Sequence, residues 1–256
     1  MSSLIGVALF LLGAILASFI GVLVERLNTG QGFLIGRSRC DACGAPLTPP
    51  ALIPIFSYFL LRGRALCCGA RLSPRAPLIE VLLGGLFLAS YLQLGLVPAL
   101  PFLLLSLSVL VALVLYDLAH QILPYPLLIV FVLTSASTGF LLAPSHSIFF
   151  SSLVTALLIG GSLALIHFGS RGRAMGLADA PLAFALSLLV GTFAFSGFVF
   201  SFWIGALVGI VLLLRRPAGS RMGVEVPFAP FLAAGFLLAY FTQWNLLALI
   251  AAASLW

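Results

Sequence analysis

Two of the six carboxylates in this 256-residue chain lie where long apolar runs end. Asp117 closes the run from Pro101 to Tyr116, and Asp179 opens the run from Ala180 to Gly191. An ionisable group next to hydrocarbon is costly, so its default interpretation is a functional site. Two carboxyls at similar depth can share a proton and activate a water molecule, which is the chemistry of aspartyl proteolysis. A helix cap would explain one such residue better than two, and we predict that Asp117 and Asp179 are catalytic.

A second group of reactive side chains lies in the polar segment Glu25–Ala76. It holds all four cysteines of the chain: Cys40, Cys43, Cys67 and Cys68. A Cys-x-x-Cys pair followed by further cysteines, in a cytoplasmic loop, favours structural zinc over a disulfide. The alternative is that these residues are small, partly buried thiols without a metal.

The elements that position these residues are membrane helices. Hydrophobic residues make up 62% of the chain, charged residues 7%, and the mean hydropathy is +1.27, values that no water-soluble core of this size accommodates. Runs of about 20 apolar residues, the length that spans a bilayer, recur along the sequence. We predict an all-α polytopic fold with about eight spans: Leu4–Val24, Pro77–Val97, Ala99–Tyr116, Pro126–Leu142, Ile148–Phe168, Ala180–Gly197, Phe198–Leu214 and Pro227–Tyr240.

The basic residues predict the orientation of these spans. All twelve are arginines, and they fall in three segments, 25–76, 171–173 and 215–221. With both termini outside, every arginine is cytoplasmic, as the positive-inside rule requires. The same topology places both aspartates at the cytoplasmic face. The first apolar run has no basic residue before it, and we therefore predict that it is a membrane span rather than a cleaved signal peptide. The net charge of +6 therefore needs no nucleic-acid partner, although it can attract anionic membrane lipids.

This reading divides the chain into a first transmembrane helix (1–24), a cytoplasmic cysteine loop (25–76) and a membrane core (77–256). Glu80 lies early in the second span, where a carboxylate needs a partner. It could bind a positively charged substrate segment or a cationic cofactor, or it could form an interfacial salt bridge with an arginine of the loop. His120, close to Asp117, is interpreted as a bystander.

The order and spacing of many short motifs resemble those of type IV prepilin peptidases. The motifs extend over nearly the whole chain: Ser18-Phe19, Glu25-Arg26-Leu27, Arg37 to Gly44, Ile53-Pro54, Ser57-Tyr58, Arg62-Gly63-Arg64, Cys68-Gly69-Ala70, Pro77 to Glu80, Tyr116-Asp117, Leu123-Pro124, Met175 to Asp179 and Val226 to Phe231.

The resemblance implies a GxGD-type aspartyl protease of the inner membrane. Its substrates would be the precursors of type IV pilins and of the pseudopilins of type II secretion. Cleavage on the cytoplasmic side removes a positively charged leader after a glycine. The family aspartates map onto Asp117 and Asp179. Many members also methylate the new N-terminus with S-adenosylmethionine, whose sulfonium Glu80 could bind.

The sequence departs from the family pattern at three positions. Ala178 replaces the second glycine of the GxGD motif, and Pro181 replaces a basic residue that often follows the second aspartate. Ala65 occupies the usual third cysteine position, which predicts that zinc is held weakly. The alternatives are therefore a catalytically inactive homologue and, from other functional classes, a membrane transporter or scaffold.

Overall fold

The computed structural model describes residues 2–28, 32, 40, 42–46, 48, 53–215 and 226–246. Within these ranges the regular structure is helical, apart from isolated bridges at Pro46 and between Arg64 and Arg71. Contacts group the chain into two compact units, Met1–Val97 and Pro98–Trp256. The predicted all-α membrane fold is confirmed, and each predicted span overlaps a helix. The functional division into 1–24, 25–76 and 77–256 stays a prediction.

Unit 1 consists of two long antiparallel helices with the cysteine loop between them in sequence. Its elements are α1 (Ser2–Arg26), the short α2 (Phe56–Leu60) and α3 (Arg75–Leu94). Glycines let the backbones of α1 and α3 approach closely: a Cβ added at Gly13 would lie 2.8 Å from the Cα of Gly84. Small residues at such crossings are typical of packed membrane helices.

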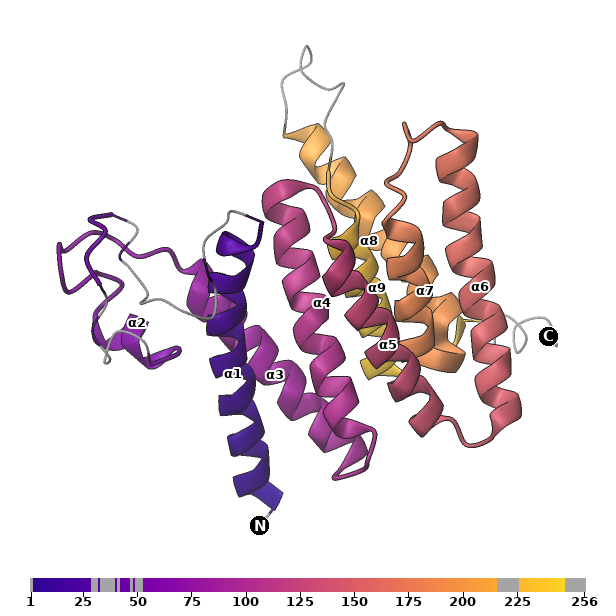
Figure 1. The fold of residues 1–256 in the computed structure, drawn as a ribbon, viewed down its shortest axis with the longest axis horizontal. Helices are drawn as coiled ribbons and strands as arrows, with labels where there is room; N and C mark the ends of the chain where they lie inside the picture. Colours follow the sequence, from indigo (N-terminus) through magenta and orange to yellow (C-terminus); the bar gives the residue numbers. More distant parts are fainter. Residues whose placement is uncertain are drawn as a thin grey trace. The chain divides into compact units, whose positions relative to one another are not determined.

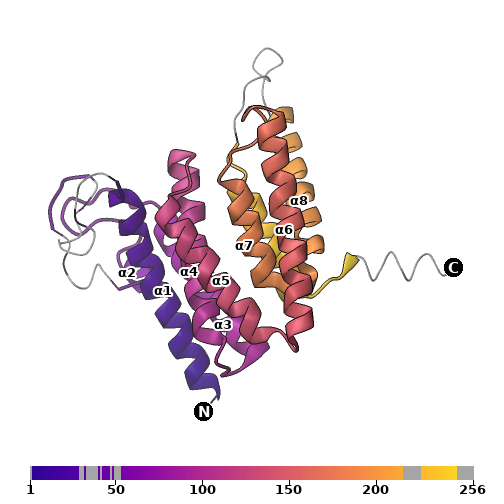
Figure 2. The same cartoon turned by 45° about the vertical axis from the view of Figure 1, so that its right-hand side comes forward.

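Unit 2 is a bundle in which consecutive helices run in alternating directions (Figures 1 and 2). The ends of α4, α6 and α8 therefore lie at the same end of the bundle as the starts of α5, α7 and α9. The most enclosed helix is α7, in which all residues except Pro181 and Phe184 are buried. The helices are α4 (Leu100–His120), α5 (Tyr125–Leu142), α6 (His146–Gly169), α7 (Asp179–Val190), α8 (Ala194–Leu214) and α9 (Ala229–Thr242).

Six helical stretches in the described residues are long and apolar enough to cross a membrane, with Asp179–Leu214 counted as one. That stretch is interrupted at the 3-10 turn Gly191–Phe193. Gly191 has φ 63° and ψ −123°, a conformation that only glycine adopts readily. The stretch therefore forms two helices, α7 and α8. The predicted break at Ser196 and Gly197 is wrong, since both residues lie inside α8.

The short length of α7 determines where Asp179 lies. Twelve helical residues extend about 18 Å, well short of a hydrocarbon core of about 30 Å. In Figure 1, α7 begins below the end of α6, and the connecting residues 170–178 descend between the two levels. Non-helical backbone within the hydrocarbon region of a bilayer is tolerated where protein surrounds it. Asp179 therefore lies within the end of the bundle, rather than at its tip.

Candidate functional site

Asp117 lies in the last turn of α4 and is 7% exposed. The backbone amide of Ala229, the first residue of α9, interacts with its carboxyl group. Oδ2 is buried and makes no hydrogen bond to any residue that the structure describes. Because a buried, unpaired carboxyl oxygen is costly, its presence calls for an explanation, and a ligand or water bound in catalysis is one.

Asp179 is the first residue of α7 and is 8% exposed. The backbone amide of Gly176 interacts with its carboxyl group, and a Cβ at Gly176 would lie 3.4 Å from Oδ2. The N-terminus of α7 presents further amide dipoles, which favour a negative charge at this position. The Asp179 carboxyl is thus held against the backbone of the loop that precedes α7.

The fold brings the two predicted aspartates to one end of unit 2. Asp117 is at the end of α4 and Asp179 is at the start of α7, and their carboxyls interact electrostatically. Helix α9 contacts both α4 and α7, so its N-terminus completes the surroundings of the pair. Such a pair can hold one proton between two carboxyls, the arrangement that acid–base hydrolysis needs.

Two of the three departures from the family pattern fit the local backbone. Ala178 has φ −70° and ψ −17°, which alanine adopts without strain, so this chain needs no glycine there. Pro181 is the third residue of α7, in the first turn, where a missing N–H breaks no helical hydrogen bond. Neither residue distorts the backbone beside Asp179.

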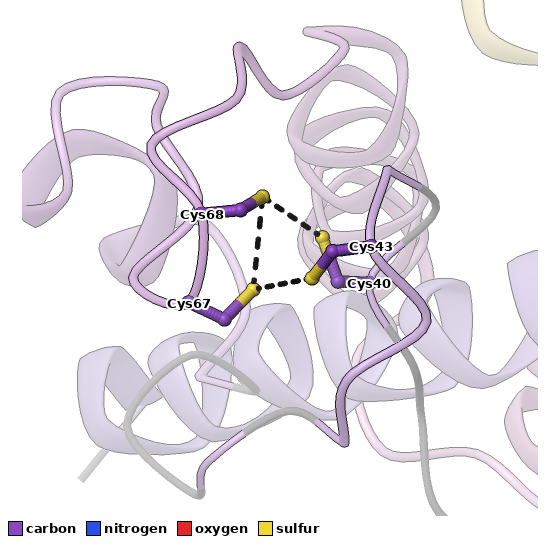
Figure 3. A group of neighbouring side chains, drawn as sticks. All are labelled: Cys40, Cys43, Cys67 and Cys68. Carbon is purple, nitrogen blue, oxygen red and sulfur yellow. Dashed lines mark hydrogen bonds between the residues drawn. The ribbon is translucent and has the colours of Figure 1, made fainter.

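The four cysteines come together in unit 1, as Figure 3 shows. Their sulfur atoms all lie within 4.8 Å of one another. Cys40 and Cys68 are 3.8 Å apart, Cys43 and Cys67 3.3 Å, and Cys67 and Cys68 3.9 Å between Sγ atoms. A tetrahedral zinc site with Zn–S bonds of about 2.3 Å has sulfurs about 3.8 Å apart. The cluster therefore has the ligand type, number and spacing of a metal site.

Two matching turns present these cysteines. In the first, the Cys40 amide donates to the Ala45 carbonyl and its carbonyl accepts from Gly44; in the second, Ala65 makes the same two bonds with Ala70 and Gly69. Ala65 thus occupies the place that Cys40 has in the first turn. Cys67, one position before Cys68, supplies the fourth sulfur instead.

Backbone amides favour the thiolate form of Cys40. The amides of Ala42 and Cys43 stabilise the Cys40 thiolate and lower the pKa of that thiol to about 7. Because the thiolate is the form that binds metals, Cys40 is the ligand most readily available at neutral pH.

Glu80, the third predicted site residue, is buried in unit 1 and holds the cysteine loop. Its Oε2 accepts a hydrogen bond of 2.6 Å from the Ile55 amide, and the Ser18 hydroxyl of α1 also interacts with its carboxyl. These are its partners in the described structure, and neither is an arginine of the loop, which was one of the alternatives left open by the sequence. Ile55 has φ 63° and ψ −56° in a γ-turn closed by a 2.6 Å bond from Phe56 N–H to the Pro54 carbonyl. This conformation is strained for a β-branched residue, and Glu80 stabilises it.

The histidines of unit 2 differ in what they contact. His120 is exposed and its ring lies against Tyr116, with the ring centroids 4.4 Å apart. His167, near the end of α6, was not identified from the sequence. Its Nδ1 lies 2.8 Å from the carbonyl oxygen of Met175, in the loop that leads to Asp179. No sequence motif distinguishes it, because the contact depends on how the loop folds back.

Comparisons with known proteins were made for the whole chain. A family model described as the bacterial peptidase A24 N-terminal domain matches residues 11–94, which lie within unit 1. The prepilin leader peptidase/N-methyltransferase of Bacillus subtilis (strain 168) is 34% identical over 239 residues, covering 91% of this chain and 92% of the relative. The protein of the same name from Dickeya chrysanthemi is 33% identical and covers 88% of both chains. No solved structure matches.

Proposed function

The chain belongs to the prepilin leader peptidase/N-methyltransferase family, and we propose that it is a membrane aspartyl endopeptidase acting on the leaders of type IV prepilins and pseudopilins. One observation supports this most strongly. Two buried carboxyls from different helices, Asp117 and Asp179, interact at the same end of unit 2, and one oxygen of Asp117 has no partner in the described structure.

In the proposed mechanism the pair acts as one acid–base unit. One carboxylate accepts a proton from a water molecule as that water attacks the scissile carbonyl carbon. The other carboxyl is protonated and donates to the carbonyl oxygen. The resulting tetrahedral intermediate collapses when a proton reaches the leaving amine. We assign the unpaired Asp117 Oδ2 as the atom that contacts the attacking water, because it is free to accept a hydrogen bond.

The site's position suits a substrate that combines a basic leader with a hydrophobic helix. We propose that both aspartates face the cytoplasm of a cell whose inner membrane this protein spans. The arginine distribution supports this orientation. A substrate helix would then lie in the bilayer while its leader, ahead of the scissile bond, remains in the cytoplasm.

We propose that the cysteine cluster binds structural zinc through Cys40, Cys43, Cys67 and Cys68. The fit of the four sulfurs supports this, and a bound ion would fix the loop between α1 and α3. We also propose N-methylation as a second activity of unit 1. The binding of the S-adenosylmethionine sulfonium by Glu80 stays a proposal, beside the contacts that this buried carboxyl makes with Ile55 and Ser18. We also propose that Glu80 positions the cysteine loop through its bond to Ile55.

The alternative of an inactive homologue rested partly on Ala178 and Pro181. Both residues fit the backbone beside Asp179 without strain, which favours an active enzyme.

The direct test is incubation of the purified protein with a prepilin, with the products identified by mass spectrometry. Wild-type protein should release the leader by a single cut ahead of the hydrophobic helix. Asp117→Asn should reduce the rate on the order of 10³-fold or more, because the acid–base pair is lost. Glu25→Gln, which removes an exposed carboxylate of unit 1, is the matched control and should cleave like the wild type. Absence of cleavage by the wild type, or full activity of Asp117→Asn, would contradict the proposal.

A further inference from the structure

The loop that leads to Asp179 is ordered by hydrogen bonds to two residues at the C-terminal end of α6, His167 and Ser170. Residues 170–178 connect α6 to α7 and contain no helix. Met175 is partly buried in this loop, whereas Gly172 and Gly176 are exposed. A loop with so little burial gains its order from hydrogen bonds rather than from packing.

His167 makes three of those bonds, with both its backbone and its ring. Its carbonyl oxygen accepts from the Gly172 amide at 2.8 Å and from the Ser170 hydroxyl at 3.2 Å. Its Nδ1 lies 2.8 Å from the Met175 carbonyl oxygen. Since a carbonyl can only accept, Nδ1 carries the hydrogen and donates. Gly172, at φ 76°, packs over the ring, where an added Cβ would lie 3.2 Å from Cε1.

The peptide group between Met175 and Gly176 links this histidine to Asp179. Its carbonyl oxygen accepts from His167, and its N–H interacts with the Asp179 carboxyl. Because the peptide group is planar, fixing its oxygen also fixes the direction of its N–H. Hydrogen bonds in such a chain also polarise and strengthen one another. The Gly176 carbonyl accepts from the Asp179 amide at 3.4 Å, which closes the turn.

We propose that His167 is a positioning residue that orients the Asp179 carboxyl through the Met175–Gly176 peptide group. The inference rests on the proposed proteolytic function. His167 touches neither substrate nor water in this scheme. Its contribution is to hold the second carboxyl in the geometry that lets it act together with Asp117.

The test compares side chains of similar size that differ in whether they place a hydrogen-bond donor at the position of Nδ1. In His167→Asn the amide nitrogen takes approximately the place of Nδ1 and can still donate to Met175. His167→Leu has nearly the shape of Asn without a donor. His167→Gln remains polar, but its amide reaches the position of Nε2 instead. The control pair is Asn and Leu at His146, an exposed residue at the opposite end of α6.

Two readouts are measured on the full-length protein in detergent: prepilin cleavage kinetics, and hydrogen exchange of the amides in residues 172–178. For His167→Leu and His167→Gln we expect faster exchange in this loop and a kcat lowered about 100-fold, the usual effect of a misplaced catalytic group, with KM unchanged. For His167→Asn we expect kcat and exchange close to wild type. The His146 variants should change neither readout.

A wild-type kcat in folded His167→Leu or His167→Gln would overturn the proposal, as would an Asn variant as slow as Leu. If the Leu variant fails to fold, the Asn and Gln pair decides. If wild-type protein cleaves no prepilin, the proposed function fails, and the exchange data alone show whether His167 holds the loop.

Discussion

The carboxyls of Asp117 and Asp179 interact because a helix end and a helix start meet at one level of the bundle. Asp117 is in the last turn of α4, and Asp179 begins α7, which is too short to reach the level where α6 ends. Each carboxyl also meets a backbone amide, from Ala229 for Asp117 and from Gly176 for Asp179. These amide dipoles therefore offset part of the free-energy cost of burying each carboxyl.

Ala178 provides a prediction about this local backbone. We expect Ala178→Gly, which restores the family glycine, to change kcat/KM by no more than roughly twofold, because a substitution that relieves no strain usually shifts energies by about 0.5 kcal/mol or less. The measurement is prepilin cleavage by the purified variant. A large gain in rate would show that alanine limits Asp179, contrary to its unstrained φ of −70°.

At the level of elements, the turn at Gly191 separates α7 from α8 and ends α7 after twelve residues. Gly191 has a positive φ of 63°, and Gly139 and Gly235 let α5 contact α7 and α9 contact α8 through their backbones. Positions of this kind hold a helical bundle together at close range.

We expect Gly191→Ala to destabilise the protein by about 1–3 kcal/mol, since alanine must adopt a backbone conformation that only glycine tolerates. Unfolding in a denaturing detergent titration measures this. Gly209→Ala, in α8 with open space at its Cβ position, is the matched control and should be neutral or slightly stabilising. Equal stability of the two variants would contradict the assignment of the turn to Gly191.

The sequence allowed some of these elements to be predicted and not others. Hydropathy identified the long helices because each lies in a continuous apolar run, and it also located α9, which has 14 residues. It misplaced the break between α7 and α8, since residues 180–214 are apolar throughout and only the conformation of Gly191 marks the turn. Asp117 and Asp179 could be identified by their scarcity in an apolar chain. Cys67 as the substitute for Ala65, and His167 as a contact of Met175, depend on how loops fold back, which no local pattern encodes.

At the scale of the whole molecule, the two units hold different chemistry. Unit 1 contains the cysteine cluster and Glu80 and includes the segment matched by the N-terminal family model, whereas unit 2 contains both aspartates. We expect the two units to support two separable activities, methyl transfer and peptide hydrolysis.

Replacing Cys40 and Cys43 with Ser tests this separation. The double variant should lose bound zinc. It should lose methylation by about tenfold or more while cleavage falls far less, because metal loss loosens the loop locally. Metal analysis and mass spectrometry of the pilin product provide the readouts. Leu66→Ser, a change at an exposed position within the second turn, is the control. Cleavage abolished together with zinc would show that the loop is integral to the protease.

The central claim, that Asp117 and Asp179 act as one catalytic unit, is tested most directly by a double-mutant cycle on prepilin cleavage. We predict that Asp117→Asn, Asp179→Asn and the double variant all lose nearly the same factor in kcat/KM, because removing either carboxyl disables the pair. All three must remain folded in membranes. Single losses that multiply in the double variant, or wild-type activity in either single variant, would contradict the claim.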